Sequence, residues 1–269
     1  ERATAKGVSL RMFSHHDVEG LRQLLRADMS KGMQPVIAAD GFCPACAVAA
    51  PVKEYLQLAR EYGGYLLLDD TQALGIFGKQ PQQAHPYGRG GGGSLRLHNA
   101  YGPEVIIISS LAKGFGVPVT VLAGSRKLVN WFTEQSETRV HCSPPSVAVI
   151  HAVEHALRIN AAYGDQLRQH LTRLVLTFSR MLAATGVKTL GGLFPVQTVL
   201  PNRRLNAVRL HDVLLKHGIR SVLHRGHLDR KAQLSFLLTA RHELEDVRQA
   251  AEVVRQVIKA GKSFSYSMY

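Results

Sequence analysis

The stretch that most constrains the fold is IIISSLAKGFG at 106–116, in which an apolar run ends at two serines before a lysine and a glycine turn. The run is short, β-branched and bounded by turn residues, which is typical of a buried strand. Lys113 therefore lies just past the strand's carboxyl end. Open α/β sheets bind ligands at this edge, and lysine is rarely fully buried without a partner. The sequence thus predicts an α/β sheet with a functional lysine at its carboxyl edge.

A second apolar run places a carboxylate at the same kind of position. Residues 65–68 predict a strand that ends in Asp69 and Asp70. A lysine that forms a Schiff base, with a carboxylate that holds a pyridinium N–H, is the pair that pyridoxal 5′-phosphate (PLP) chemistry needs. The hydroxyls of Ser109 and Ser110, together with the N–H groups of the glycine turn, are suited to binding a phosphate.

The segments LLLDDTQALGIFG (66–78) and SSLAKGFG (109–116) resemble the α-oxoamine synthase group of fold-type-I PLP-dependent enzymes. The resemblance extends over most of the chain. It implies an α/β fold, with a mostly parallel sheet in a large domain and a smaller C-terminal α+β domain. The implied boundaries are 1–145 for a partial PLP-binding domain, 146–185 for a bridging helix and 186–269 for the small domain.

The hydrophobic periodicity predicts the secondary structure of the C-terminal half. Pro144 and Pro145 precede a long helical pattern, predicted over 147–184. From residue 187 the pattern changes to short elements. The sequence predicts strands over 194–200, 219–223 and 233–238 and a helix over 243–258.

The resemblance also implies roles for single residues. It implies Lys113 as the Schiff-base lysine, Asp69 as the partner of the pyridinium nitrogen and Ser110 as a phosphate contact. Cys43 falls where the family has a serine that contacts the cofactor's ring oxygen, and Gln72 falls where it has a histidine. Glutamine can hydrogen-bond the ring oxygen but takes up no proton near neutral pH. No metal site is expected.

Two further departures from the family bear on the chemistry. The family has a longer N-terminal portion, which carries the aromatic residue stacked on the cofactor, so we expect this chain to be one part of a longer polypeptide. The family's arginine for the amino-acid carboxylate corresponds to Ser235, which cannot form a bidentate ionic contact. His224, Arg225 and Arg230, just upstream, are candidates to compensate.

The activity implied is a PLP-dependent transferase that condenses an amino acid with an acyl thioester, carried by CoA or by an acyl carrier protein. A homodimer is implied as well. A PLP-dependent aminotransferase is the first alternative, and it would release no free thiol. A non-catalytic basic binding module is the second, and it would show no cofactor absorbance.

Composition narrows the range of partners. The formal charge is +13 and the sequence pI is about 10.0. The basic residues are scattered and lack interleaved aromatics, so we expect no nucleic acid, whereas a positive rim would steer acidic CoA or a carrier protein. No apolar run approaches the ~20 residues of a membrane span. Three cysteines are too few for a disulfide framework and favour a reducing, cytoplasmic setting.

Two motifs suggest kinds of site other than a PLP site. Cys43-Pro44-Ala45-Cys46 suits a redox pair or half of a zinc site, but structural zinc needs four ligands and the chain has no second Cys-x-x-Cys. Four glycines at 90–93 look like a phosphate cradle, but the Lys-Ser/Thr of a P-loop does not follow them. We therefore interpret 85–94 as a flexible surface loop, a candidate lip over the site.

Overall fold

The computed structural model describes residues 8–28, 33–140, 142–201, 205–226 and 231–265, with side chains as far as residue 260. Internal contacts divide the chain into two compact units. The first comprises 1–42, 49–80 and 90–159, and the second comprises 43–48, 81–89 and 160–269. None of the helices among the described residues is both long enough and apolar enough to pass through a membrane.

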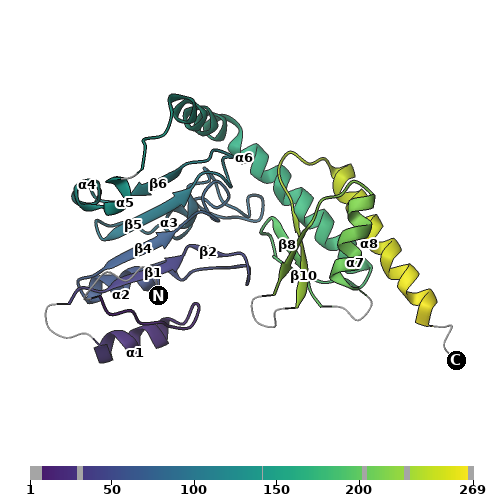
Figure 1. Ribbon diagram of the computed structural model, residues 1–269, viewed down its shortest axis with the longest axis horizontal. Helices are drawn as coiled ribbons and strands as arrows, with labels where there is room; N and C mark the ends of the chain where they lie inside the picture. Colours follow the sequence, from purple (N-terminus) through teal and green to yellow (C-terminus); the bar gives the residue numbers. More distant parts are fainter. Residues whose placement is uncertain (1–7, 29–32, 141, 202–204, 227–230, 266–269) are drawn as a thin grey trace. The chain divides into compact units, whose positions relative to one another are not determined.

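The first unit is built on a four-stranded sheet in the order β1-β4-β5-β6, which can be followed in Figure 1. Three of its strands run parallel to one another: β1 (Val36–Asp40), β4 (Tyr65–Asp69) and β5 (Val105–Ser110). The fourth, β6 (Thr120–Ala123), is antiparallel to β5. Asp40 lies opposite Asp69, and Asp69 lies opposite Ile108, so the carboxyl ends of the parallel strands share one edge. The mostly parallel sheet is therefore confirmed.

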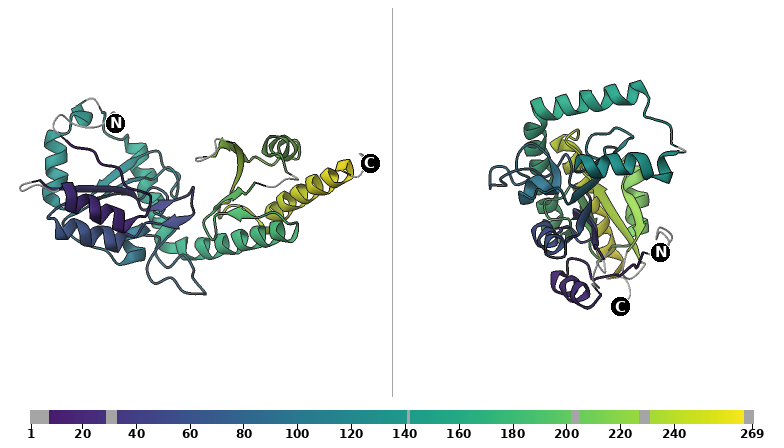
Figure 2. Two further views of the ribbon diagram at one scale, coloured as in Figure 1. Left: turned by 90° about the horizontal axis from the view of Figure 1, so that it is seen from below. Right: turned by 90° about the vertical axis from the view of Figure 1, so that its left-hand side faces the viewer.

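The core of the first unit forms where helices pack on this sheet. α2 (Val52–Glu61) packs against β1 and β4, and α1 (Val18–Asp28) packs against α2 (Figure 2). Pro51 precedes α2 at a position where its missing N–H costs nothing. Side chains of both helices and of the sheet bury their apolar surface together, among them Leu21, Leu25, Tyr55, Leu58, Leu66 and Leu68.

Five further, shorter elements and one long helix precede the second sheet in the described part of the chain. Two of the short elements are strands that pair with each other, β2 (Phe42–Cys43) and β3 (Val48–Ala49). The other three are the helices α3 (Gly93–His98), α4 (Arg126–Gln135) and α5 (Glu137–Val140). The long helix predicted over 147–184 is confirmed as α6 (Val147–Ala184). The domain boundaries at 145 and 185 stay a prediction.

The second unit contains an antiparallel sheet in the order β7-β8-β10-β9. Its strands are β7 (Thr189–Leu190), β8 (Val196–Val199), β9 (Val222–Arg225) and β10 (Ala232–Leu237). α7 (Ala207–Lys216) packs against β9, β10 and α8 (Leu244–Ser265). This mixture of helices and antiparallel strands confirms the predicted α+β character.

The start of β9 differs from its prediction for an identifiable backbone reason. The strand predicted to start at Ile219 starts at Val222, because the Ile219 N–H still bonds the Leu214 carbonyl at the end of α7 at 2.9 Å. β6 starts at Thr120, two residues after Pro118, whose nitrogen has no hydrogen to give to a ladder.

Gln197 is a polar centre of the second unit. Its side chain is fully buried in β8. Its Nε2 donates to the carbonyls of Gly192 at 3.0 Å and Phe194 at 2.6 Å, and its Oε1 accepts from the hydroxyls of Thr189 at 2.7 Å and Ser179 at 3.1 Å. One amide therefore satisfies groups on α6, β7 and the turn before β8. Buried polar groups need such partners.

We expect Gln197→Leu to lower the free energy of unfolding by at least about 2 kcal/mol, because an unsatisfied buried polar group costs about 1–3 kcal/mol. Urea unfolding measures the loss. Gln256→Leu is the matched control, since Gln256 is exposed on α8 and bonds the neighbouring Glu252. Equal losses in the two variants would contradict a special role for Gln197.

Candidate active site

The carboxyl edge of the first-unit sheet carries the two predicted catalytic side chains. Asp69 ends β4, is exposed, and accepts a hydrogen bond on Oδ1 from the Thr71 N–H at 2.9 Å. Lys113 lies in the turn after β5 and is also exposed. Because β4 and β5 are adjacent and parallel, both residues lie at the edge where α/β sheets bind ligands.

Two contacts fix the turn after β4 against the turn after β5. The Ser110 N–H donates to Thr71 Oγ1 at 2.9 Å. At Gly114, the residue after the lysine, an added Cβ would lie 2.5 Å from the Leu74 carbonyl oxygen and 3.4 Å from the Gly75 Cα. A side chain at 114 would therefore push the two turns apart, and glycine permits the close approach. The position of the lysine turn depends on these contacts.

The serines at the end of β5 provide hydroxyl groups for a phosphate. Ser109 is buried, and its Oγ has no hydrogen-bond partner among the described residues. Ser110 is half-buried, and its Oγ accepts from the Ala112 N–H at 3.4 Å. Gln72 is half-buried in the turn after β4. An amine, a carboxylate, an amide and an unsatisfied hydroxyl at one sheet edge fit a cofactor with a pyridine ring and a phosphate.

The glycine run has a structural task, which corrects its interpretation as a flexible loop. Gly93 begins α3, and the Ser94 N–H donates to both carboxylate oxygens of Asp70, at 3.2 and 3.0 Å. Gly93 has a φ of 76°, and an added Cβ would lie 1.9 Å from Asp70 Oδ2. Glycine fits there because any side chain would meet the carboxylate. The run encloses a buried aspartate of the chain itself.

Part of the segment just before the glycine run, at residues 85–88, is packed against the second unit. The ring of Tyr87 is 1% exposed, and its hydroxyl donates to the Leu193 carbonyl. Burial raises the pKa of Tyr87, which keeps the hydroxyl in its donor form. Nε2 of Gln169 lies 3.0 Å from Nδ1 of His85. These contacts pack His85 and Tyr87 against the second unit, whereas the sequence predicted a surface loop over 85–94.

Asp70 follows Asp69, the predicted pyridinium partner, in the chain. Its carboxylate has a shifted pKa. Asp70 is 2% exposed. Burial raises its pKa from 3.8 to about 6, against the hydrogen bonds from Ser94, which stabilise the charged form. Between these two values the unfolded chain releases the proton before the folded chain does. Raising the pH through this range therefore favours unfolding.

We expect the ionisation of Asp70 to lower the free energy of unfolding by about 2 kcal/mol between pH 4 and pH 6, because one pKa unit corresponds to about 1.4 kcal/mol. Asp70→Asn keeps an oxygen for the Ser94 N–H and carries no charge, so its stability should change less over this range. Urea unfolding at a series of pH values measures both. Asp212→Asn, at an exposed position of α7, should behave like the unchanged protein. The same pH response in both variants would contradict this account.

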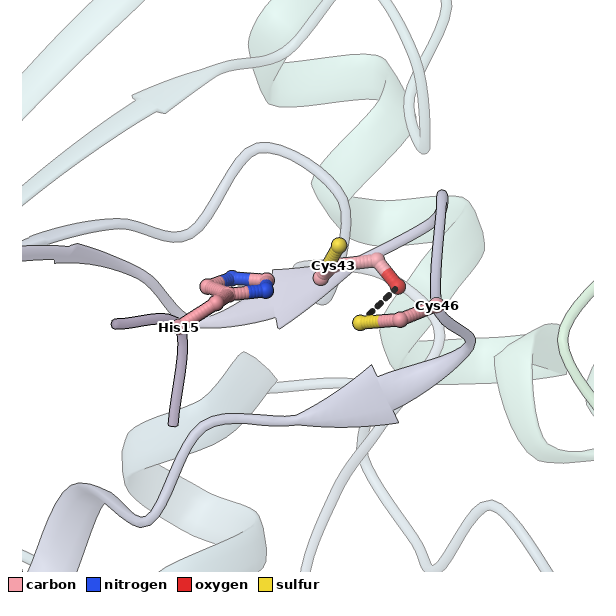
Figure 3. Close-up of side chains that lie close together, drawn as sticks. All are labelled: His15, Cys43 and Cys46. Carbon is pink, nitrogen blue, oxygen red and sulfur yellow. Dashed lines mark hydrogen bonds between the residues drawn. The ribbon is translucent and has the colours of Figure 1, made fainter. Parts of the chain in front are cut away.

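Cys43 belongs to the second unit and is buried in β2. Figure 3 shows the thiol of Cys46 directed at the carbonyl oxygen of Cys43, to which it donates at 3.9 Å. The predicted contact of Cys43 with the cofactor's ring oxygen stays a prediction.

Ser235, which stands at the family's arginine position, is buried in β10. Its Oγ lies 2.7 Å from Thr198 Oγ1 and 2.8 Å from His224 Nε2. His224 thus contacts Ser235 directly, in line with its candidacy to compensate for the arginine. Arg230 lies outside the described residues. The three side chains form one hydrogen-bonded polar group within the second unit.

Sequence reasoning missed two positioning residues, Thr71 and Ser94. A signal existed for Thr71, since a residue two positions after an aspartate commonly closes a turn onto that carboxylate. The bond from the Ser94 N–H to Asp70 spans 24 residues of sequence, and a local pattern does not reveal such a partner.

The fold, with Asp69 and Lys113 at the carboxyl ends of adjacent parallel strands, is that of fold-type-I PLP-dependent transferases. A family model described as aminotransferase class I and II matches residues 2–254, and the chain belongs to this family, whose cofactor is PLP. The predicted fold and cofactor are thereby confirmed.

Individual relatives show which members of the family the chain resembles. The chain is 27% identical over 259 residues to the 8-amino-7-oxononanoate synthase of Alkalilimnicola ehrlichii, covering 95% of this chain and 63% of that relative. The chain is 29% identical over 237 residues to the same enzyme of Chromobacterium violaceum, covering 87% of this chain and 58% of that relative. The chain thus spans about three fifths of the curated relatives it matches. Serine palmitoyltransferase of Sphingomonas wittichii shares the fold, with a TM-score of 0.78 at 18% identity over 93% of this chain and 60% of that one.

Proposed function

We propose that the chain provides the lysine-bearing part of a PLP-dependent transferase that condenses an amino acid with an acyl thioester. The observation that carries the proposal is the position of Asp69 and Lys113 after adjacent parallel strands. The similarity to enzymes named 8-amino-7-oxononanoate synthase supports the α-oxoamine synthase type.

PLP, when bound, supplies an electron-accepting ring. Lys113 would hold the cofactor through Nζ and, once released, would move the α-proton of the amino acid as a general base. Asp69 would hold the proton on the ring nitrogen, with its carboxylate oriented by the Thr71 N–H. Ser110 would bind the phosphate. Gln72 would hydrogen-bond the ring oxygen but would not take part in proton transfer.

Two second-unit residues complete the proposed set. Cys43 would be a weak contact for the ring oxygen, because a thiol is a poor hydrogen-bond donor. Ser235 would meet the amino-acid carboxylate with His224 beside it, since His224 Nε2 lies 2.8 Å from its hydroxyl. A hydroxyl with an imidazole binds a carboxylate more weakly than a bidentate arginine does.

The proposed partners follow from charge and from the family. An acyl-CoA or an acyl carrier protein would supply the acyl group, and the net charge of +13 would attract either of these acidic molecules. A homodimer is proposed as the active unit and the cytoplasm as its location. An aminotransferase remains the second candidate, because the matching family model carries that description.

The reaction type is tested with Lys113→Ala. The longer polypeptide that we expect to contain this chain, given PLP, acyl-CoA and a panel of amino acids, should release free CoA thiol, and borohydride should fix the cofactor to Lys113. Lys113→Ala should lose both, because no amine remains at the sheet edge. Lys127→Ala, at an exposed position of α4, should keep both. Amino transfer to a keto acid without thiol release would identify the aminotransferase instead, and labelling of another lysine would reject the assignment.

We expect Asp69→Asn to retain PLP but to lose at least about 100-fold in turnover, which is about 3 kcal/mol in the barrier. The asparagine amide cannot hold a positive charge on the ring nitrogen, so the ring accepts electrons poorly. Cofactor absorbance and thiol release, measured on the same sample, separate binding from turnover. Near-normal turnover would show that Asp69 does not face the ring nitrogen.

A further inference from the structure

Cys43 and Cys46 form a close pair of thiols in the hairpin that joins β2 to β3. Both are thiols in the structure, and their Sγ atoms lie within 4.8 Å of each other (Figure 3). A disulfide needs a separation of about 2.05 Å. Both side chains come from one short hairpin, and bond formation requires their Sγ atoms to approach from the separation in the structure.

The two thiols differ in their access to solvent. Cys43 is 8% exposed, whereas Cys46 is half-buried. A dissolved reagent therefore meets Cys46 first. Cys43 is placed to react next, from inside the hairpin, with whatever forms on its neighbour. This is the arrangement of an attacking and a resolving thiol.

We propose that Cys43 and Cys46 are a redox modification site, which closes to an intramolecular disulfide when it meets a low-molecular-weight disulfide such as oxidised glutathione. The thiolate of Cys46 attacks one sulfur of the oxidant and releases one glutathione thiolate. The thiolate of Cys43 then attacks the Cys46 sulfur of this mixed disulfide and releases the second. The protein loses two protons and two electrons, and the oxidant becomes two molecules of glutathione thiol.

The site is a slow sensor rather than a catalytic dithiol. Burial, followed by the neighbouring Cys43 side chain, raises the pKa of Cys46, so little thiolate exists near neutral pH. Catalytic Cys-x-x-Cys pairs have a lowered pKa instead. The chemistry needs these two thiols alone and does not rest on the proposed transferase function.

The test uses the third cysteine as an internal control. Cys142 is exposed and is a thiol as well. Reduced protein is incubated with oxidised glutathione, remaining thiols are alkylated, and intact mass and non-reducing peptide maps are recorded. We expect a 43–46 cross-link and, at these two residues, the loss of two hydrogen atoms. Cys142→Ser should keep the cross-link, while Cys46→Ser and Cys46→Ala should lose it.

The mapping of the unchanged protein decides the outcome even if a variant folds poorly. A stable glutathione adduct on Cys46 without the cross-link would overturn the proposal. So would a cross-link that involves Cys142, or retention of both hairpin thiols after Cys142 has reacted.

Discussion

The parallel pairing of β4 with β5 is the constraint on which the candidate site depends. It brings two turns, far apart in sequence, to one sheet edge, where the two turns contact each other. The Ser110 N–H bonds Thr71, and Gly114 lies against Leu74 and Gly75. The aspartate and the lysine therefore receive their positions from the backbone beneath them, and their exposed side chains stay available for a ligand.

Both units bury an apolar core, and each encloses a polar group within it. The first buries leucines and Tyr55 between helices and a parallel sheet, and the start of α3 encloses the carboxylate of Asp70. The second buries Leu174, Phe178 and Phe236, and its buried amide, Gln197, joins α6 to the turns of an antiparallel sheet. Substitutions should therefore act by lost apolar burial in both units, and by unsatisfied hydrogen bonds at Asp70 or Gln197.

The sequence was sufficient for the fold class and for the strand ends that carry Asp69 and Lys113, because both depend on short apolar runs bounded by turn residues. It was insufficient for the glycine run, since the reason for Gly93 is Asp70, more than twenty residues earlier in the chain. It also misplaced the start of β9, where backbone bonding at the end of α7 delays the strand. Local patterns describe elements well, and contacts between distant segments decide the remainder.

Asp69 and Asp70 occupy consecutive positions but experience opposite surroundings, because side chains alternate at a strand end. In the proposed function Asp69 would carry a negative charge beside the cofactor, whereas burial makes negative charge unfavourable at Asp70. Conditions that suit catalysis are therefore not those that suit stability. This adjacent pair sets a trade-off: a variant selected for stability near neutral pH has reason to change Asp70, while one selected for turnover must keep its neighbour.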